Sequence, residues 1–254
     1  MLHPFRCGVP ISCLAARCTH RPSFGGLPLS NANTNIKIRN RAFEWLRELV
    51  MRHGEVLPRS ILQAGFVLDG EQIRLVGPQG IFKPRVMSLP LSITTVASGP
   101  YDDEFGRDGL LRYRYRGRDP DHRDNVGLRQ AMMGAVPLVY FHGIARGKYL
   151  AAWPVFIVGD DPLGLTFSVA VDDAEIISDH LVDRVADGGL TSTEDDIRRA
   201  YVTRSFRQRL HQQGFRERVL QAYQEQCAFC RLRHQELLDA AHIIPDGEPG
   251  GDPI

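Results

Sequence analysis

The sequence predicts an α+β protein built around a compact, mostly antiparallel β domain with flanking helices. Short apolar runs cut by glycine and proline fill residues 65–171, and apolar side chains recur at helical spacing on both sides of this region. The chain has 254 residues, of which 43% are hydrophobic and 24% charged, as in an ordinary globular protein. That length accommodates one main domain and a small second module.

The β region is marked by the runs GFVLDGEQIRLVG, PLVYF, WPVFIVGDDP and LTFSVAV. Such runs are typical of short strands, and the DG and GDDP segments supply the turns between them. No repeat with a period of roughly 20–50 residues is present, which argues against a solenoid or a propeller. We therefore expect a compact domain of mostly antiparallel strands.

Four segments are predicted along the chain. Residues 1–35 have no sustained period, so we expect a disordered or over-extended N-terminus. Residues 36–175 form the β domain, with a leading helix that begins near Lys37. Residues 176–203 are acidic, contain a Gly-Gly and a Ser/Thr cluster, and are expected to be a linker. Residues 204–254 start with a basic amphipathic helix and form the second module.

Charge and hydropathy restrict the partners. The net charge is only +1, so a nucleic-acid site must be a local patch. No run of roughly 18 apolar residues is present, so we expect no membrane association and a cytoplasmic location. The five cysteines are an odd number, which is a poor basis for a disulfide framework.

Cys227 and Cys230 form a C-x-x-C pair directly after the second predicted helix. This spacing places two thiolates correctly for tetrahedral zinc, which needs a second pair of ligands that is not visible in the sequence. A redox role is the alternative, although no βαβ pattern surrounds the pair.

The cysteines are followed by LLDAAHIIPDGEPGGD. Together with the C-x-x-C, this segment resembles the first half of an HNH (ββα-metal) endonuclease domain of the McrA type. The resemblance implies that His242 is the general base and that a divalent ion (Mg, Mn or Ni) assists cleavage. It also implies structural zinc on Cys227 and Cys230 if the domain is complete.

Two departures from the HNH pattern put the activity in doubt. Ala241 stands where many HNH domains have an aspartate that binds the metal ion. The Asn, the final His and the second zinc pair of the family lie further on than the matching residues. We therefore expect an incomplete ββα-metal module, truncated within the motif, with weak activity or none.

Residues 111–116 alternate strictly between apolar and basic side chains. Leu111, Tyr113 and Tyr115 fall on one face of a predicted strand, and the intervening positions are arginines. In an arbitrary protein this pattern indicates a half-buried strand with solvated arginines. An acidic cluster before the strand and further arginines after it favour contact with DNA.

The stretch GPYDDEFGRDGLLRYRYRGRD resembles part of the SRA domain, a PUA-like barrel that flips a modified cytosine out of duplex DNA. The resemblance implies that Tyr101 and Tyr113 sandwich the extruded base, and that Asp103 or Glu104 accepts from its exocyclic amino group. It places Asn125 near the loop that enters the duplex. The arginines then contact DNA phosphates. These arginines are Arg112, Arg114, Arg116, Arg118 and Arg129.

The sequence therefore predicts a modification-dependent restriction endonuclease, in which a base-flipping module recruits an HNH nuclease for defence against foreign DNA. A non-catalytic module that binds modified DNA is the alternative. An enzyme acting on small molecules is disfavoured, because neither a phosphate loop nor a nucleophile elbow is present. The expected partner is double-stranded DNA, and a homodimer stays open. No role is assigned to residues 77–85, GPQGIFKPR.

Overall fold

A computed structural model describes residues 29–96, 104–106, 108–172 and 192–241, with the backbone alone for residues 29–32, 104–105 and 192–201. The helices are α1 (Leu29–His53), α2 (Arg59–Ala64), α3 (Arg123–Met133), α5 (Ser192–Ala222) and the 3₁₀ turn η1 (Gln235–Leu237). The strands are β1 (Val56–Pro58), β2 (Phe66–Leu68), β3 (Glu71–Ile73), β4 (Ile81–Phe82), β5 (Ser92–Thr95), β6 (Glu104–Phe105), β7 (Leu111–Arg114), β8 (Leu138–Ala145), β9 (Lys148–Asp161) and β10 (Thr166–Val171).

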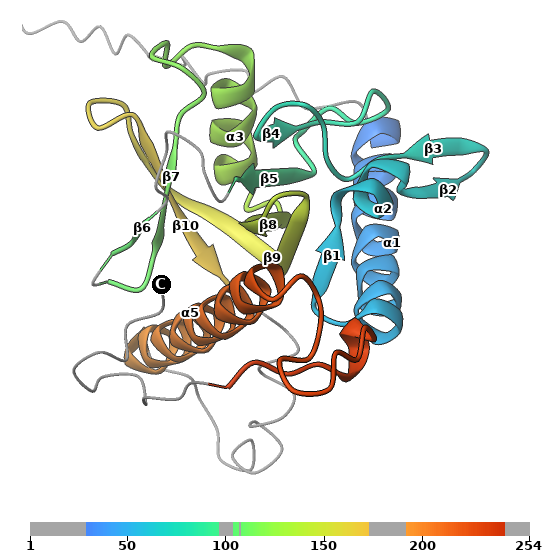
Figure 1. Cartoon of the computed structure of the whole chain (residues 1–254). Helices are drawn as coiled ribbons and strands as arrows, with labels where there is room; N and C mark the ends of the chain where they lie inside the picture. The colour runs from blue at the N-terminus through green and yellow to red at the C-terminus, as the bar shows by residue number, and fades with distance from the viewer. Residues whose placement is uncertain (1–28, 97–103, 107, 173–191, 242–254) are drawn as a thin grey trace, which may run out of the picture.

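The main sheet has the strand order β4-β5-β8-β9-β10-β7-β6, and β1 pairs with the start of β9. It curls into a half-barrel, beside which β2 and β3 form a separate hairpin (Figure 1). Its pairs are antiparallel except that of β5 with β8, whose crossover includes α3. The predicted α+β class with a mostly antiparallel β domain and flanking helices is confirmed at this level.

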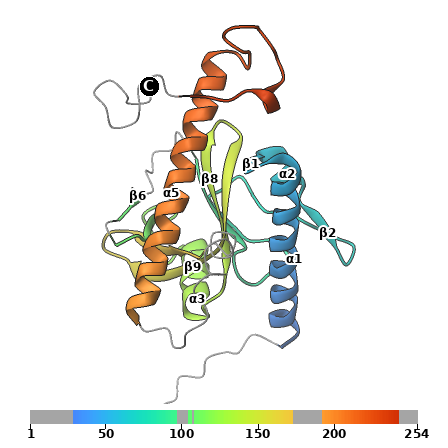
Figure 2. The ribbon, with the colours of Figure 1, turned by 90° about the horizontal axis from the view of Figure 1, so that it is seen from below.

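The central strands of the sheet are buried on both faces. In β8, Leu138 and Tyr140 belong to one core cluster, whereas Val139 and Phe141 belong to the other. Helices α1 and α5 cover opposite sides of these strands (Figure 2). A strand covered on both faces needs a continuous apolar run, which explains the PLVYF segment.

Strand β7 has the predicted alternation. Leu111, Tyr113 and Tyr115 are buried, and Arg114 between the tyrosines is exposed. The Tyr115 ring stacks on Phe167 of the neighbouring strand β10, with 4.5 Å between ring centroids. The apolar face of β7 therefore points into the core and its basic face points outward.

Helix α1 begins at Leu29, earlier than the start predicted near Lys37. Two buried polar side chains attach its first half to the β domain. Asn35 donates to Ser88 Oγ at 2.9 Å, and Arg39 donates to the Pro90 carbonyl at 2.6 Å. Burial lowers the pKa of Arg39 to about 10. Hydrogen bonds therefore hold this part of the helix, in place of the regularly spaced apolar side chains that mark the second half.

Helix α5 begins at Ser192, inside the stretch 176–203 that was expected to be a linker. Residues 192–203 of that stretch are helical, and the helix packs on the β domain from Val202 onward. Val202 and Phe206 lie in the same core cluster as β7 and β10, and Thr203 Oγ1 donates to the Gly109 carbonyl at 2.7 Å. No described helix is long and apolar enough to span a membrane.

We predict that Phe206→Ala lowers the free energy of unfolding by about 3–5 kcal/mol, the usual cost of removing a buried phenylalanine ring. Phe206 is fully buried, whereas Leu163 in the turn between β9 and β10 is 98% exposed. Leu163→Ala is the matched control and should change stability by less than about 0.5 kcal/mol. Urea denaturation followed by circular dichroism measures both. Equal stability of the two variants would show that α5 is not part of the β-domain core.

Candidate functional site

A pocket of about 290 Å³ lies beside strand β7. Its lining comes from Arg59 and from residues 77–81, 94–96 and 113–117. Ligand pockets usually range from about 300 to 1,000 Å³, so this one lies at the lower end of that range and is large enough for a single ring. The sheet brings its walls together, since β4 pairs with β5 and Tyr113 faces the loop before β4.

Two arginines hold the wall formed by residues 77–80. Arg59 Nη2 donates to the Gly77 carbonyl at 2.5 Å, and its Nη1 donates to Tyr149 Oη at 2.7 Å. Arg116 donates to Gln79 Oε1. Both ends of this short loop are therefore fixed by charged donors, which restricts its movement in the absence of a ligand.

Gly80 lets this wall approach the tyrosine strand closely. A Cβ atom at Gly80 would lie 2.8 Å from Tyr113 Oη and 3.1 Å from the Thr94 carbonyl oxygen. The Thr94 N–H also donates to the Gly80 carbonyl at 2.7 Å. A larger residue at this position would have to displace either the buried tyrosine or strand β5.

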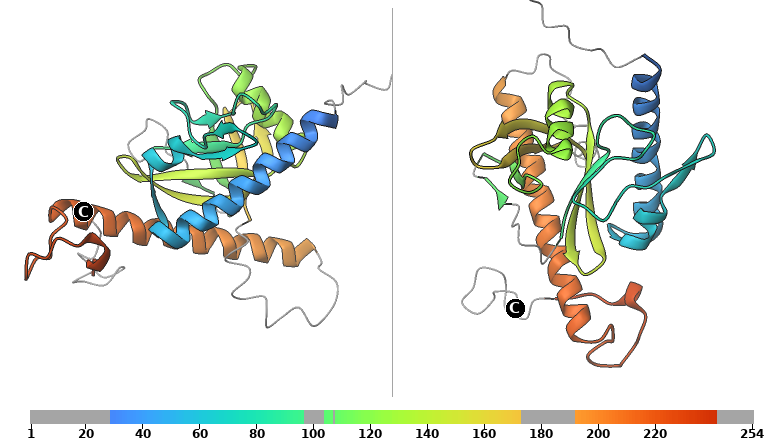
Figure 3. Two further views of the ribbon diagram at one scale, coloured as in Figure 1. Left: turned by 90° about the vertical axis from the view of Figure 1, so that its right-hand side faces the viewer. Right: turned by 90° about the horizontal axis from the view of Figure 1, so that it is seen from above.

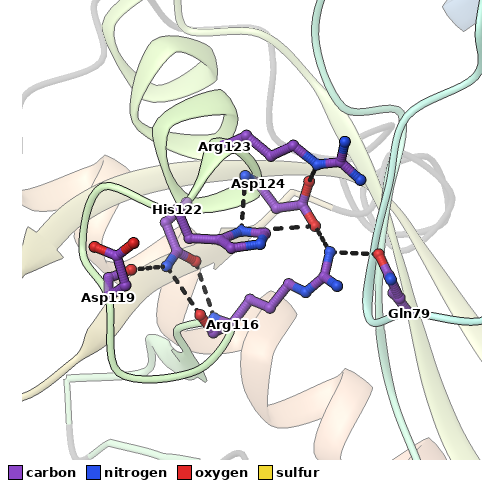
Figure 4. A network of polar contacts seen from close by, with 7 residues as sticks. Gln79, Arg116, Asp119, His122, Arg123 and Asp124 are labelled. Carbon is purple, nitrogen blue, oxygen red and sulfur yellow. Dashed lines mark hydrogen bonds and ion pairs between the residues drawn. The ribbon is translucent and has the colours of Figure 1, made fainter.

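Arg116 connects the pocket wall to the start of α3 (Figure 4). Its guanidinium forms an ion pair with Asp124, whose side chain is only 17% exposed. His122 caps the helix, because its Nδ1 accepts from the Asp124 N–H at 3.2 Å. Gln79, Arg116 and Asp124 thus form one polar chain from the loop to the helix.

Asn125 is fully buried one residue further along α3. Its Oδ1 accepts from the Arg116 N–H at 2.9 Å, and its Nδ2 donates to the carbonyls of Asp119 at 2.8 Å and Arg116 at 3.2 Å. The amide therefore fixes the turn that follows the tyrosine strand. Its predicted place near a loop that enters DNA stays a prediction.

Three of the five arginines that were assigned to DNA phosphates pair with carboxylates of the chain itself. Arg112 bonds to Asp108, Arg116 to Asp124, and Arg129 to Asp160 at 2.7 Å. Hydrogen bonds to Asp160 and Tyr115 raise the pKa of Arg129. Arg114 and Arg118 are the exposed members of the five.

The predicted base-recognition residues are only partly placed. Tyr113 lines the pocket and is 5% exposed. Glu104 lies in β6, where its backbone pairs with Arg112 of β7. The structure describes only the backbone of this residue. Tyr101 and Asp103 lie outside the described residues. Of the two tyrosines that were predicted to stack on the base, the structure therefore places only Tyr113.

Several pocket residues carried no functional prediction. The loop 77–81 is the start of the GPQGIFKPR segment. Its two glycines could have indicated a site, because glycine permits another part of the chain or a ligand to approach the backbone closely. Arg59 and Thr94 gave no local signal. They join the site through contacts between segments that are far apart in the chain.

Cys227 and Cys230 form a tight knuckle after α5. The Cys227 N–H donates to the Leu232 carbonyl at 2.9 Å, and Arg231 adopts a left-handed φ of 62°. Hydrogen bonds from the backbone N–H groups of Cys230 and Phe229 lower the pKa of the Cys227 thiol. The knuckle suits thiolate chemistry with a metal or an oxidant.

The second half of the predicted nuclease site is not described. His242 lies outside the described residues. Within residues 29–241, apart from the gaps given above, no group of three or more His, Cys, Asp or Glu side chains is placed to hold a metal ion. The two cysteines of the knuckle are fewer than the four ligands that a structural zinc ion needs.

Comparison of the chain with protein-family models, with curated proteins and with solved structures gave no match.

Proposed function

We propose that this chain binds duplex DNA containing a modified cytosine, extrudes that base and holds it in the pocket beside Tyr113. The observation that carries the proposal is the pocket itself, which is large enough for one ring and is bounded by Tyr113 and a fixed glycine-rich loop. Enzymes and readers that act on a single base take it out of the stack into a close-fitting pocket.

The chemistry of the lining supports this assignment. Unpairing and unstacking a base costs a few kcal/mol, and stacking on aromatic side chains returns about 1–3 kcal/mol per base. Tyr113 offers one ring for such contact, and we assign the second face of the base to Tyr101. We assign the exocyclic amino group to Asp103 or Glu104, since a carboxylate accepts from an amino donor.

The distribution of charge supports DNA as the partner. Arg114 and Arg118 are exposed, and Arg123 at the start of α3 keeps a side chain that is 82% exposed although its Nε lies 3.6 Å from Asp124. Arg114 also lines the pocket. Guanidinium groups at this position would hold the phosphates on either side of the extruded nucleotide, which gives affinity without sequence information.

The C-terminal segment extends the proposal to a restriction endonuclease of the HNH family in the cytoplasm. The Cys227–Cys230 knuckle supports it, because two free cysteines in C-x-x-C spacing are typical of half of a zinc site. Beyond it, His242 would act as base beside a divalent ion. The alternative function, a module that only binds modified DNA, requires the pocket but not His242.

We predict that the chain binds a duplex with one 5-methylcytosine about 3- to 10-fold more tightly than the unmodified duplex, because burial of the methyl group in the pocket contributes about 1 kcal/mol that unmodified cytosine lacks. Gly80→Ala should remove this preference, since the added Cβ meets the Tyr113 hydroxyl at 2.8 Å. Gly214→Ala is the matched control, because its Cβ meets nothing closer than 3.6 Å. Fluorescence anisotropy measures all three proteins. Equal affinity of the wild-type chain for both duplexes would refute the proposed function.

We further predict that Arg118→Ala reduces the slope of log K against log salt by about 1, the loss expected for one phosphate contact. Arg52→Ala serves as the control, because Arg52 is an exposed arginine at the end of α1. It should leave the slope unchanged. A titration from low to moderate salt distinguishes the two, and an unchanged slope for Arg118→Ala would remove this side chain from the DNA interface.

Endonuclease activity is expected to be weak or absent in the 254-residue chain. Residues 243–254 contain no histidine, cysteine or asparagine, so His242 is the only HNH catalytic side chain in this segment. A general base alone contributes about 10²–10⁴-fold. The measurement is nicking of a methylated plasmid with magnesium, manganese or nickel, with His242→Ala as the control. Rapid cutting that His242→Ala abolishes would contradict this expectation.

A further inference from the structure

Strand β4 is followed by a basic turn, residues 83–87. The Met87 N–H donates to the Pro84 carbonyl at 3.0 Å, which closes the turn. Pro84 and Met87 are buried, whereas Lys83 and Arg85 are exposed. The buried positions therefore anchor the turn, and its two basic side chains are open to solvent.

The basic turn is fixed at both ends. After it, Asn35 of α1 holds Ser88, since Asn35 Nδ2 donates to Ser88 Oγ at 2.9 Å and Asn35 Oδ1 accepts from the Ser88 N–H at 3.3 Å. Before it, the Phe82 carbonyl accepts from the Leu91 N–H at 2.9 Å. A turn held in this way loses little conformational freedom when it binds a partner.

The charge of the basic turn has no local counter-charge. Residues 72–101 contain the basic residues Arg74, Lys83 and Arg85 and no acidic residue. In the part of the chain that the structure describes, neither Lys83 nor Arg85 forms an ion pair or a side-chain hydrogen bond. This distinguishes them from the three arginines that pair with carboxylates of the chain itself. The turn therefore presents two positive charges to solvent.

Two walls of the pocket lead into exposed basic residues. Residues 77–81 form one wall, and the chain continues from them to Lys83. Residues 113–117 form the other wall, and the chain continues from them to Arg118. A hydrogen bond between the two walls joins them, and strand β4 lies beside α3 (Figure 1). Positive charge therefore follows the pocket on two sides.

We infer that Lys83 and Arg85 bind backbone phosphates of DNA beside the pocket, on the opposite side from Arg114 and Arg118. The inference rests on the proposed function, which supplies DNA as the partner and an extruded nucleotide as the occupant of the pocket. Each nucleotide within a strand has one phosphate on its 5′ side and one on its 3′ side. Two basic walls match these two phosphates, because both lysine and arginine bind phosphate. The basic part of the GPQGIFKPR segment thereby gains a role.

Removing either charge should change the salt dependence of binding while the fold is kept. Lys83→Ala and Arg85→Ala should each reduce the slope of log K against log salt by about 1, and weaken binding about 2- to 5-fold at moderate salt. The loss should be equal for 5-methylcytosine and unmodified duplexes, because phosphates carry no sequence information. Both variants should melt within about 2 °C of the wild-type chain, as is usual for exposed side chains.

Arg52→Ala is the matched control, because it removes the same charge from an exposed side chain of α1. Asn35 marks where the basic turn meets this helix, and Arg52 lies about 25 Å further along the helix axis at 1.5 Å per residue. Its slope should equal that of the wild-type chain.

A neutral methylphosphonate in place of one phosphate beside the 5-methylcytosine tests the position of the contact. Where Lys83 or Arg85 binds that phosphate, removing the side chain and the phosphate charge together should weaken binding no more than removing either one. With the methylphosphonate on the other side of the 5-methylcytosine, Arg118→Ala should show this non-additivity instead. Fluorescence anisotropy measures every combination.

The outcomes separate the two claims. Wild-type slopes for Lys83→Ala and Arg85→Ala would refute the inference, while a preference for the methylated duplex would leave the proposed function standing. Additive losses at both methylphosphonate positions would also refute it, because the side chains would then not bind beside the base. If the wild-type chain binds both duplexes equally and both slopes fall, base recognition fails while phosphate binding by the basic turn is supported. If the wild-type chain binds no DNA, both claims fail.

Discussion

The burial of β8 and β9 on both faces is the constraint on which the rest of the structure depends. Tyr140, Leu150 and Ala152 face one core cluster, whereas Tyr149, Ala151 and Trp153 face the other. A sheet that is apolar on both sides must be covered on both sides, because apolar surface is removed from water only by packing. Helix α1 and the β2–β3 hairpin supply one cover, and α3 and α5 supply the other (Figure 3). The pocket lies toward the edge of this double layer, where the sheet curls and β7 meets the loop before β4.

The pocket depends on polar contacts rather than on further apolar packing. Arg59 and Arg116 hold the loop 77–80, and Asp124 holds Arg116. Each of these polar contacts joins segments that the strand pairing already brings close. Forming the contact therefore costs little additional conformational entropy of the chain. A site fixed in this way binds with less ordering of its own side chains. The pairing of Arg116 with Asp124 also shows why basic residues cannot be equated with DNA contacts, since a guanidinium with a local carboxylate partner is partly neutralised.

Helix α5 joins the β domain to the cysteine knuckle without a flexible break among the described residues. Lys148 at the start of β9 lies 2.5 Å from Glu217, which is 4% exposed, and Arg209 pairs with Glu55 at 3.3 Å. Arg216 of the same helix donates to the carbonyls of Gln235 and Leu238. The residues after α5 consequently lie at the end of the molecule away from α3 (Figures 2 and 3). A second module in this position would have a fixed distance from the pocket.

The sequence by itself determined the elements whose signal is local. The alternation of residues 111–116 and the helical spacing of residues 206–222 follow from the burial of one face, and the apolar run at β8 follows from the burial of both; each predicted element is confirmed. Tertiary structure decided the rest. The first half of α1 is held by buried Asn35 and Arg39, and Arg129 is paired with Asp160 from 31 positions away. The pocket likewise combines Arg59, Gly80 and Thr94, which lie in separate segments of the chain. Such features depend on which distant groups meet, and a local pattern of residue types does not contain that information.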